Sequence, residues 1–129
     1  MPKTDAVQSV CGTPLEPCSE SGMPQTGYTR EGRCTSHRKD SGSHHVCIRN
    51  VGTGAAGRNF CDVTGQPDWC AAKKDWCVCE WAFDRAVQKA GCDDFDVKCE
   101  ATNQLALVHY ERAGKTHAAE CLRSKCQKA

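Results

Sequence analysis

The sequence predicts an α+β fold in a single small domain, with a loop-rich N-terminal half carrying short strands, two to three helices in the C-terminal half, and cysteine staples. Three observations lead to this prediction. Leu, Ile, Val and Phe number only 17 of 129 residues, below the roughly 20% that separates folded chains from highly charged disordered ones. Twelve residues are cysteines, a density typical of small disulfide scaffolds. Gly, Pro, Ser and Thr interrupt the chain up to about residue 67, whereas a helical pattern follows from residue 75.

The cysteines compensate for the small apolar core. Apolar burial at about 25 cal/mol per Å² must offset roughly 1 kcal/mol or more of ordering entropy per residue. One disulfide adds about 2 to 4 kcal/mol by restricting the unfolded chain. Disulfides persist in oxidising compartments, yet the polar segment 1–8 does not have the apolar run of a signal peptide. Either a leader was removed or metal ligation replaces some of the disulfides.

The expected elements, in order, are a loose arm over 1–10, a strand over 46–51, a helix over 76–90, a half-buried strand over 95–99, and helices over 103–113 and 116–125. For the first helix, Asp75 is the expected N-cap and Gly91 the expected stop. The second helix is capped by Thr102 or Asn103 and ends at Gly114. No domain boundary is visible, so residues 1–129 form one domain.

The charge balance excludes some partners. The formal net charge is +1, from 17 basic and 16 acidic residues, so no long-range field attracts nucleic acid or an anionic membrane. No stretch reaches the roughly 18 to 20 apolar residues that a membrane span needs. The sequence has no phosphate-binding glycine loop and no Gly-x-Ser-x-Gly segment, so there is no recognisable catalytic motif and enzymatic activity stays open. A protein or a small molecule remains as the possible partner.

The pair Cys77 and Cys79 is the first candidate site. A Cys-x-Cys pair can chelate a metal or form a strained disulfide. Within a helix over 76–90, however, residues two apart point about 200° away from one another. Cys79 then lies on the buried stripe, and Cys77 lies in the first turn, where the helix dipole favours a thiolate. Cys77 is therefore the candidate reactive cysteine, and a staple end is the favoured alternative.

A second candidate site combines cysteine and histidine. The pairs Cys34 with His37 and His44 with Cys47 share a three-residue spacing that suits zinc. No Cys-x-x-Cys knuckle accompanies them, so loop histidines and disulfide cysteines are the favoured interpretation and no cofactor is predicted. His109 and His117 are expected on helix surfaces. The remaining helix-flanking cysteines suit staples: Cys92, Cys99, Cys121 and Cys126.

Several segments together resemble a known family. They are Gly12-Thr13-Pro14-Leu15-Glu16-Pro17-Cys18-Ser19, Thr26-Gly27-Tyr28 followed by Cys34, Gly42-Ser43-His44-His45-Val46-Cys47, Trp76-Cys77-Val78-Cys79, and Glu100-Ala101-Thr102-Asn103. In this order they resemble the mainly bacterial family catalogued as domain of unknown function 2237, over about residues 12–107. The resemblance implies a soluble cytoplasmic protein and no established activity.

The resemblance also sorts the cysteines. The cysteines at family motif positions are Cys18, Cys34, Cys47, Cys77 and Cys79. The other seven are the better staple candidates: Cys11, Cys61, Cys70, Cys92, Cys99, Cys121 and Cys126. Asn103 stands where the family has His, and His45 stands where it has Thr, while His44 matches the family residue.

Two functional hypotheses follow. The favoured one is a non-enzymatic, disulfide-stapled binding or scaffold module whose loops between residues 19 and 67 engage a partner, because loops on a rigid scaffold often carry binding. The alternative is a thiol-redox or zinc-binding protein that uses the motif residues Cys77, Cys34, Cys47, His44 and Cys18.

Overall fold

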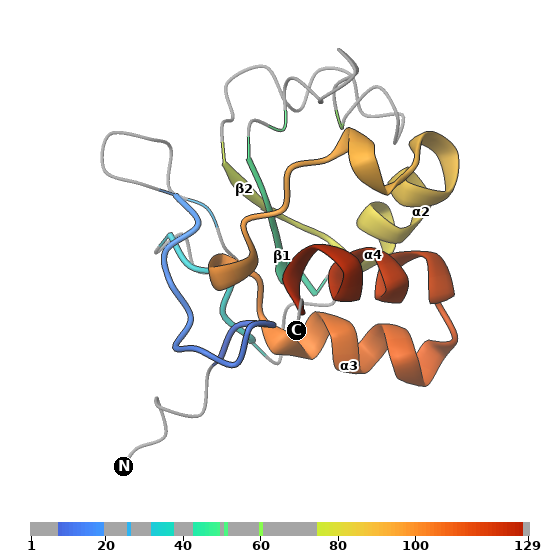
Figure 1. The fold of residues 1–129 in the computed structure, drawn as a ribbon. Coiled ribbons are helices and arrows are strands. Elements are labelled where there is room, and N and C mark those ends of the chain that lie inside the picture. The colour runs from blue at the N-terminus through green and yellow to red at the C-terminus, as the bar shows by residue number, and fades with distance from the viewer. Residues whose placement is uncertain are drawn as a thin grey trace.

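A short β-ribbon and three helices make up the frame of the molecule, as Figure 1 shows. The computed structural model describes residues 8–19, 26, 32–37, 43–49, 51, 60 and 75–127. The strands and helices of this part are β1 (Val46–Ile48), β2 (Trp76–Val78), α2 (Glu80–Ala90), α3 (Gln104–Ala113) and α4 (Thr116–Cys126). Two 3₁₀ turns, Cys92–Asp94 and Cys99–Ala101, lie between α2 and α3. The α+β class with cysteine staples is confirmed.

The two strands of the ribbon run antiparallel, with Val46 opposite Val78 and Cys47 opposite Cys77. Successive side chains of a strand point to opposite faces. The strand residues that join the main apolar core are Val46, Ile48, Trp76 and Val78. Cys47 and Cys77 lie on the other face, in a second cluster with Cys18, Cys34 and Ala101. The ribbon therefore separates an apolar core from a sulfur-rich one.

A threonine hydroxyl accepts one outward-facing amide from each strand of the ribbon. The Cys47 amide donates to Thr102 Oγ1 at 3.1 Å, and the Cys77 amide donates to Thr26 Oγ1 at 2.8 Å. The Thr102 hydroxyl in turn donates to the Lys98 carbonyl at 3.0 Å. An unpaired buried amide costs about 1 to 3 kcal/mol, so each threonine satisfies an amide that would otherwise lack a partner. The backbone of segment 96–98 also bonds to β1, since the Arg49 amide donates to the Asp96 carbonyl and the Lys98 amide donates to the Cys47 carbonyl.

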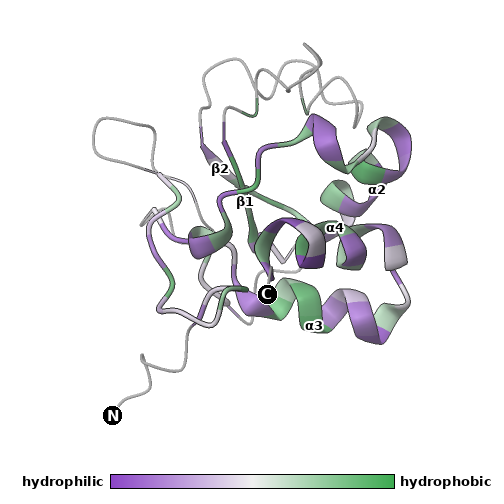
Figure 2. Ribbon diagram, in the orientation of Figure 1, coloured by the Kyte–Doolittle hydropathy of each residue, from purple (hydrophilic) through white to green (hydrophobic). Residues whose placement is uncertain are grey.

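The main core lies between the ribbon and the helices. Helix α4 packs against both α2 and α3. Edge-to-face contacts join Phe95 to Phe60 and Phe83, whose ring centroids lie 5.8 and 6.3 Å away. Green apolar residues follow the strands and alternate with purple polar ones along the helices in Figure 2, as expected for helices with one buried side. None of the helices in the described ranges has the length and apolarity required to cross a membrane.

The two C-terminal helices, Gln104–Ala113 and Thr116–Cys126, agree with the predicted ranges 103–113 and 116–125 to within one residue at each end. Asn103 caps α3, because its side-chain oxygen accepts from the Leu105 amide at 2.9 Å. Gly114 ends α3 in the left-handed conformation, with φ 70° and ψ 26°. Lys115 separates Gly114 from helix α4, which begins at Thr116 and extends to Cys126.

The segment around residue 76 was predicted wrongly. Trp76–Val78 is strand β2, and α2 begins only at Glu80 with Cys79 as its N-cap. The apolar residues of the strand are spaced so that they continue the helical pattern of α2, and the sequence pattern therefore predicted one helix across both elements. Asp75, the expected cap, instead pairs with the buried Lys98 at 3.2 Å.

Three further boundaries differ from the prediction. The strand expected over 46–51 ends at Ile48. The segment 95–99 contributes only an isolated bridge between Val97 and Ile48, because the 3₁₀ turn begins at Cys99. The loose arm expected over 1–10 is wrong for 8–10, since the Val10 amide donates to the Thr102 carbonyl at 2.9 Å and Val10 is buried.

Candidate functional site

The motif cysteines Cys18, Cys34, Cys47 and Cys77 form one buried sulfur cluster. Disulfides join Cys18 to Cys47 and Cys34 to Cys77. The sulfur atoms of Cys18, Cys34 and Cys77 all lie within 4.8 Å of one another. The exposed fractions of the four residues are 0 to 1%. External thiols therefore have no access to this cluster in the folded state, which suits a stapling role.

Cys77 does not have the surroundings that the sequence suggested. It was expected as a reactive cysteine in the first turn of a helix, but it is buried within β2 and bonded to Cys34. His44 and His37 are half-buried, and neither belongs to a group of three candidate metal ligands among the described residues. Whether the five residues Cys77, Cys34, Cys47, His44 and Cys18 share a chemical function stays a prediction. The loop segment 19–67, expected to bind a partner, lies mostly outside the described ranges.

The division of cysteines into staples and chemical residues does not match the pairing. Disulfides join Cys92 to Cys121 and Cys99 to Cys126, as expected for staple candidates. Cys11, another staple candidate, is unpaired. Cys61 and Cys70 lie outside the described residues.

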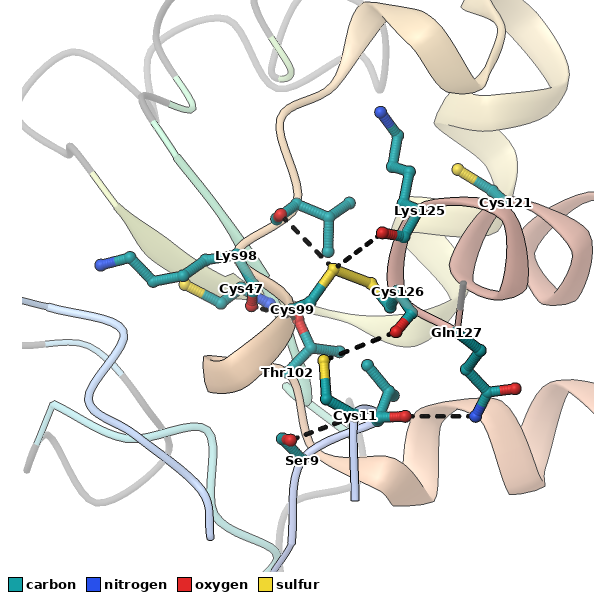
Figure 3. The surroundings of a disulfide bond; sticks show 12 residues. Ser9, Cys11, Cys47, Lys98, Cys99, Thr102, Cys121, Lys125, Cys126 and Gln127 are labelled. Atoms are coloured by element: carbon teal, nitrogen blue, oxygen red, sulfur yellow. Dashed lines mark hydrogen bonds between the residues drawn. A yellow bond between two sulfur atoms is a disulfide. The ribbon is translucent and has the colours of Figure 1, made fainter. Parts of the chain in front are cut away.

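Two thiols are unpaired in the described part of the chain, Cys11 and Cys79, and both are half-buried. Cys79 is the N-cap residue of α2. Cys11 lies beside a disulfide, as Figure 3 shows, with its sulfur 3.6 Å from the Cys126 carbonyl oxygen. The Cys11 thiol thus faces Cys126, which is disulfide-bonded to Cys99.

The Cys99–Cys126 disulfide is the most accessible of the four in the described ranges, because it alone has two half-buried members. Cys99 Sγ lies 3.6 Å from the Lys125 carbonyl oxygen at the end of α4. Two cavities have both Cys11 and Cys126 in their lining. One has a volume of about 420 Å³ and is lined by Cys11, Leu107 and Cys126, among others. The other, about 240 Å³, is lined by Cys11, both members of the disulfide, Glu100 and others.

The N-terminal segment holds Cys11 in position. Backbone hydrogen bonds fix Val10 to Thr102 and Gln104 to Gln8, each at 2.9 Å. The Gln127 side-chain amide donates to the Val10 carbonyl at 3.1 Å (Figure 3). The Cys11 amide itself donates to Ser9 Oγ at 3.1 Å. Apart from the Ser9 contact, these bonds connect residues distant in sequence, so local sequence does not predict where Cys11 lies against α4.

The surroundings of Cys11 keep its thiol protonated. Burial is the main cause that raises the pKa of Cys11, and the nearby Glu100 carboxylate raises it further. The hydrogen bond with the Ser9 side chain lowers this pKa, and Glu16 adds a smaller raising effect. A thiol with a raised pKa is a weak nucleophile at neutral pH and gains reactivity as the pH rises. The site therefore holds a resting thiol beside an accessible disulfide.

Comparison with known proteins places the chain in a family. The family model described as "Uncharacterized protein conserved in bacteria (DUF2237)" matches residues 8–117. The chain belongs to this family. The resemblance seen in the sequence motifs is thereby confirmed, and no curated protein matches the chain.

Two DUF2237 motif threonines have a structural role in this chain. Thr26 and Thr102 are the residues that accept the outward amides of β2 and β1. Asn103, where the family pattern has His, caps α3 and donates to the Cys34 carbonyl at 3.0 Å. Cys11 lies inside the DUF2237 match, but outside the motifs quoted above.

Proposed function

We propose that this DUF2237 protein is a disulfide-stapled module whose Cys11 thiol exchanges with the Cys99–Cys126 disulfide. The observation that carries the proposal is the position of an unpaired thiol against the one described disulfide with two half-buried members. The buried disulfides serve as the rigid scaffold, and the site at Cys11 serves as the exchangeable part.

The exchange needs no added oxidant or reductant. Cys11 loses its proton to water, and the thiolate attacks Cys126 Sγ. A Cys11–Cys126 bond forms while the Cys99–Cys126 bond breaks, and Cys99 leaves as a thiolate that takes a proton from water. One disulfide and one thiol are present before and after, so the step moves a cross-link without changing the oxidation level.

The two states would differ in what the end of α4 is tied to. With Cys99–Cys126 formed, α4 is joined to the 3₁₀ turn Cys99–Ala101. With Cys11–Cys126 formed, it would be joined to the N-terminal segment and Cys99 would become a thiol. The adjacent 240 Å³ cavity, which Cys99 lines, gives the released thiol access to solvent. We infer a thiol switch of this kind in an oxidising compartment, where the staples persist.

The test is to map the thiols after incubation at several pH values without oxidant. Samples are acid-quenched, alkylated and digested without reduction. We expect a fraction of chains with alkylated Cys99 and a Cys11–Cys126 peptide. At a fixed incubation time short of equilibrium this fraction should grow with pH, because the Cys11 thiolate is the attacking form. The variant Cys11→Ser should not form the exchanged chains, whereas the matched variant Cys79→Ser should form them as the parent does. Absence of alkylated Cys99 at every pH would overturn the proposal.

A second candidate function rests on the buried sulfur cluster. The sulfur atoms of Cys18, Cys34 and Cys77 lie within 4.8 Å of one another, and in a reduced chain such a group has the thiolate donors that zinc prefers. Protein kept reduced from synthesis onward should then contain zinc. Metal content should fall in Cys34→Ser and stay unchanged in Cys92→Ser. Zinc-free reduced protein would exclude this candidate without affecting the exchange at Cys11.

A further inference from the structure

A second cluster of titratable side chains lies away from the cysteine sites, where three elements meet. His45 precedes β1, Glu80 is the first residue of α2, and His109 lies in α3. His45 Nδ1 lies 2.6 Å from Glu80 Oε2. His109 Nδ1 lies 2.9 Å from the same oxygen and 3.0 Å from Glu80 Oε1. The two imidazoles thus converge on one carboxylate.

The cluster is closed on one side and open on the other. Glu80 is fully buried, with no exposed side-chain surface, and His45 is 3% exposed. The His109 side chain is 33% exposed and forms the solvent side. The rings of His45 and His109 are tilted by 45° with centroids 5.9 Å apart, so they lie around the carboxylate without stacking. A small ion could therefore reach the carboxylate past His109.

The charge of Glu80 requires compensation. Moving a carboxylate out of water costs several kcal/mol unless a cation or strong donors face it. Its position in the first turn of α2 provides part of this through the helix dipole. Its backbone carbonyl is held by the Tyr110 hydroxyl, which donates at 2.6 Å and fixes the start of α2 beside α3. The carboxylate is thus anchored in place between the two imidazoles.

We propose that His45, Glu80 and His109 form a binding site for a divalent transition metal, with zinc as the reference ion. Two imidazoles and one carboxylate are the donor set of zinc sites that keep an open coordination position. One candidate atom from each residue lies within 4.8 Å of the others. With bonds of 2.0 to 2.1 Å, tetrahedral zinc ligands lie about 3.3 Å apart, so the nitrogen and oxygen atoms need to separate by less than about 1 Å.

The ion would replace the hydrogen bonds from the two imidazoles to Glu80, with both imidazoles binding through Nδ1. The part of the chain that the structure describes contributes no further ligand within the same 4.8 Å limit. The remaining coordination position, on the side of His109, would hold water or a small anionic or thiol ligand. The site does not involve Cys11 or the Cys99–Cys126 disulfide, so it stands independently of the exchange proposal.

The test is a zinc titration of the oxidised protein after alkylation of every free thiol, including Cys11 and Cys79, the two unpaired ones in the described residues. Competition with a chromophoric chelator gives the affinity, and Co²⁺ substitution gives a visible spectrum that reports on nitrogen and oxygen ligands. We expect one ion per chain. The variant His109→Ala should weaken binding at least about tenfold, since loss of a ligand costs more than the loss of an outer-shell contact. The exposed α4 residue provides the matched control, His117→Ala, which should bind as the parent does.

A purely structural triad would give a different result. In that case neither the parent nor His117→Ala binds zinc above the alkylated, denatured chain, and this outcome overturns the proposal. Equal binding by the parent and His109→Ala would overturn it as well. Because Glu80→Gln alters a buried group and can impair folding, the decisive variant is the half-exposed His109. Zinc-induced shifts of the His45 and His109 ring resonances by NMR, with those of His117 unchanged, give a second readout.

Discussion

Cys11 illustrates how the neighbours of a single residue set its reactivity. Burial raises the pKa of its thiol, and the Glu100 carboxylate is the next cause. The thiolate is the reacting form, so alkylation at neutral pH should be slower than that of an exposed thiol with a pKa of about 8.5. The rate should rise with pH and level off only above the raised pKa.

The variant Glu100→Gln removes one of these causes. We expect its Cys11 pKa to move down towards the usual value and its alkylation at pH 8 to be faster than in the parent. The measurement is the alkylation rate of Cys11 by peptide mass spectrometry between pH 7 and 10. The exposed carboxylate Glu120 gives the control variant Glu120→Gln, whose profile should not change. Identical profiles for all three proteins would contradict the electrostatic explanation.

Tyr110 is the residue that joins α3 to the start of α2. Its hydroxyl donates to the Glu80 carbonyl at 2.6 Å, and the side chain is fully buried. Tyr110→Phe leaves that carbonyl without the donor, so the free energy of unfolding should fall by about 1 to 3 kcal/mol. Urea unfolding at pH 7 measures the loss, and an unchanged midpoint would show that water replaces the hydroxyl.

The same residue makes stability depend on alkaline pH. Burial raises the pKa of Tyr110 well above its usual range, and the charges of Glu80 and Asp84 add to this. A group with a raised pKa in the folded state contributes stability that is complete below its unfolded pKa of about 10 and is lost as the pH rises further. The parent should therefore lose stability between pH 9 and 11 more steeply than Tyr110→Phe. Parallel curves for the two proteins would contradict this assignment.

Helix ends show which local rules the chain obeys. Gly114 ends α3 at φ 70° and ψ 26°, while Gly91 follows α2 at φ 93° and ψ 154°. A Cβ at either position meets no atom within 4 Å, so only backbone strain decides the cost of a substitution. Alanine tolerates the left-handed region at about 1 kcal/mol, but the conformation of Gly91 is almost restricted to glycine.

We therefore expect Gly91→Ala to lower the free energy of unfolding by about 1 to 3 kcal/mol. Gly114→Ala should lower it by only about 1 kcal/mol. Thermal and urea unfolding of the two variants, compared with the parent, measure the difference. A larger effect at Gly114 would mean that packing at the α3–α4 turn outweighs backbone strain.

Local rules also explain which elements could be predicted. Helices α3 and α4 were predicted nearly to the residue because Asn103 and Gly114 provide a cap and a stop within the sequence itself. Strand β2 was predicted wrongly because three residues acquire their conformation from pairing with β1 and from Thr26, which is distant in sequence. Such long-range contacts produce no periodic pattern over three residues.

At the level of the whole molecule, the four described disulfides differ in accessibility. The Cys18–Cys47 and Cys34–Cys77 bonds are buried under the ribbon, whereas both members of Cys99–Cys126 are half-buried. Attack by an external thiol requires access to a sulfur atom. The sequence predicted that cysteines staple the fold, but their pairing and accessibility depend on the complete packing.

This difference predicts an order of reduction. With increasing reductant under native conditions, Cys99 and Cys126 should become alkylated first, and the four cysteines of the sulfur cluster only when the chain unfolds. Mass spectrometry of chains alkylated after each reductant concentration measures the order. The double variant Cys34→Ser with Cys77→Ser should also lose more stability than Cys99→Ser with Cys126→Ser, each loss being about 2 to 5 kcal/mol. Earlier reduction of the buried cluster would show that it opens locally.

The order of the disulfides along the chain has a consequence for proteolysis. Cys34 lies inside the loop closed by Cys18–Cys47, and Cys99 lies inside the loop closed by Cys92–Cys121, so the bonds interleave in two separate pairs. A single peptide-bond cut between Cys18 and Cys77, or between Cys92 and Cys126, leaves the fragments covalently joined. None of the four bonds crosses the segment 78–91, so a cut within α2 divides the chain into halves that these bonds do not connect. A Cys11–Cys126 bond would span that segment. A protease cut in α2 followed by denaturation would then release two fragments from the Cys99–Cys126 state. The same treatment of the Cys11–Cys126 state would give a single product whose two parts stay joined by that bond.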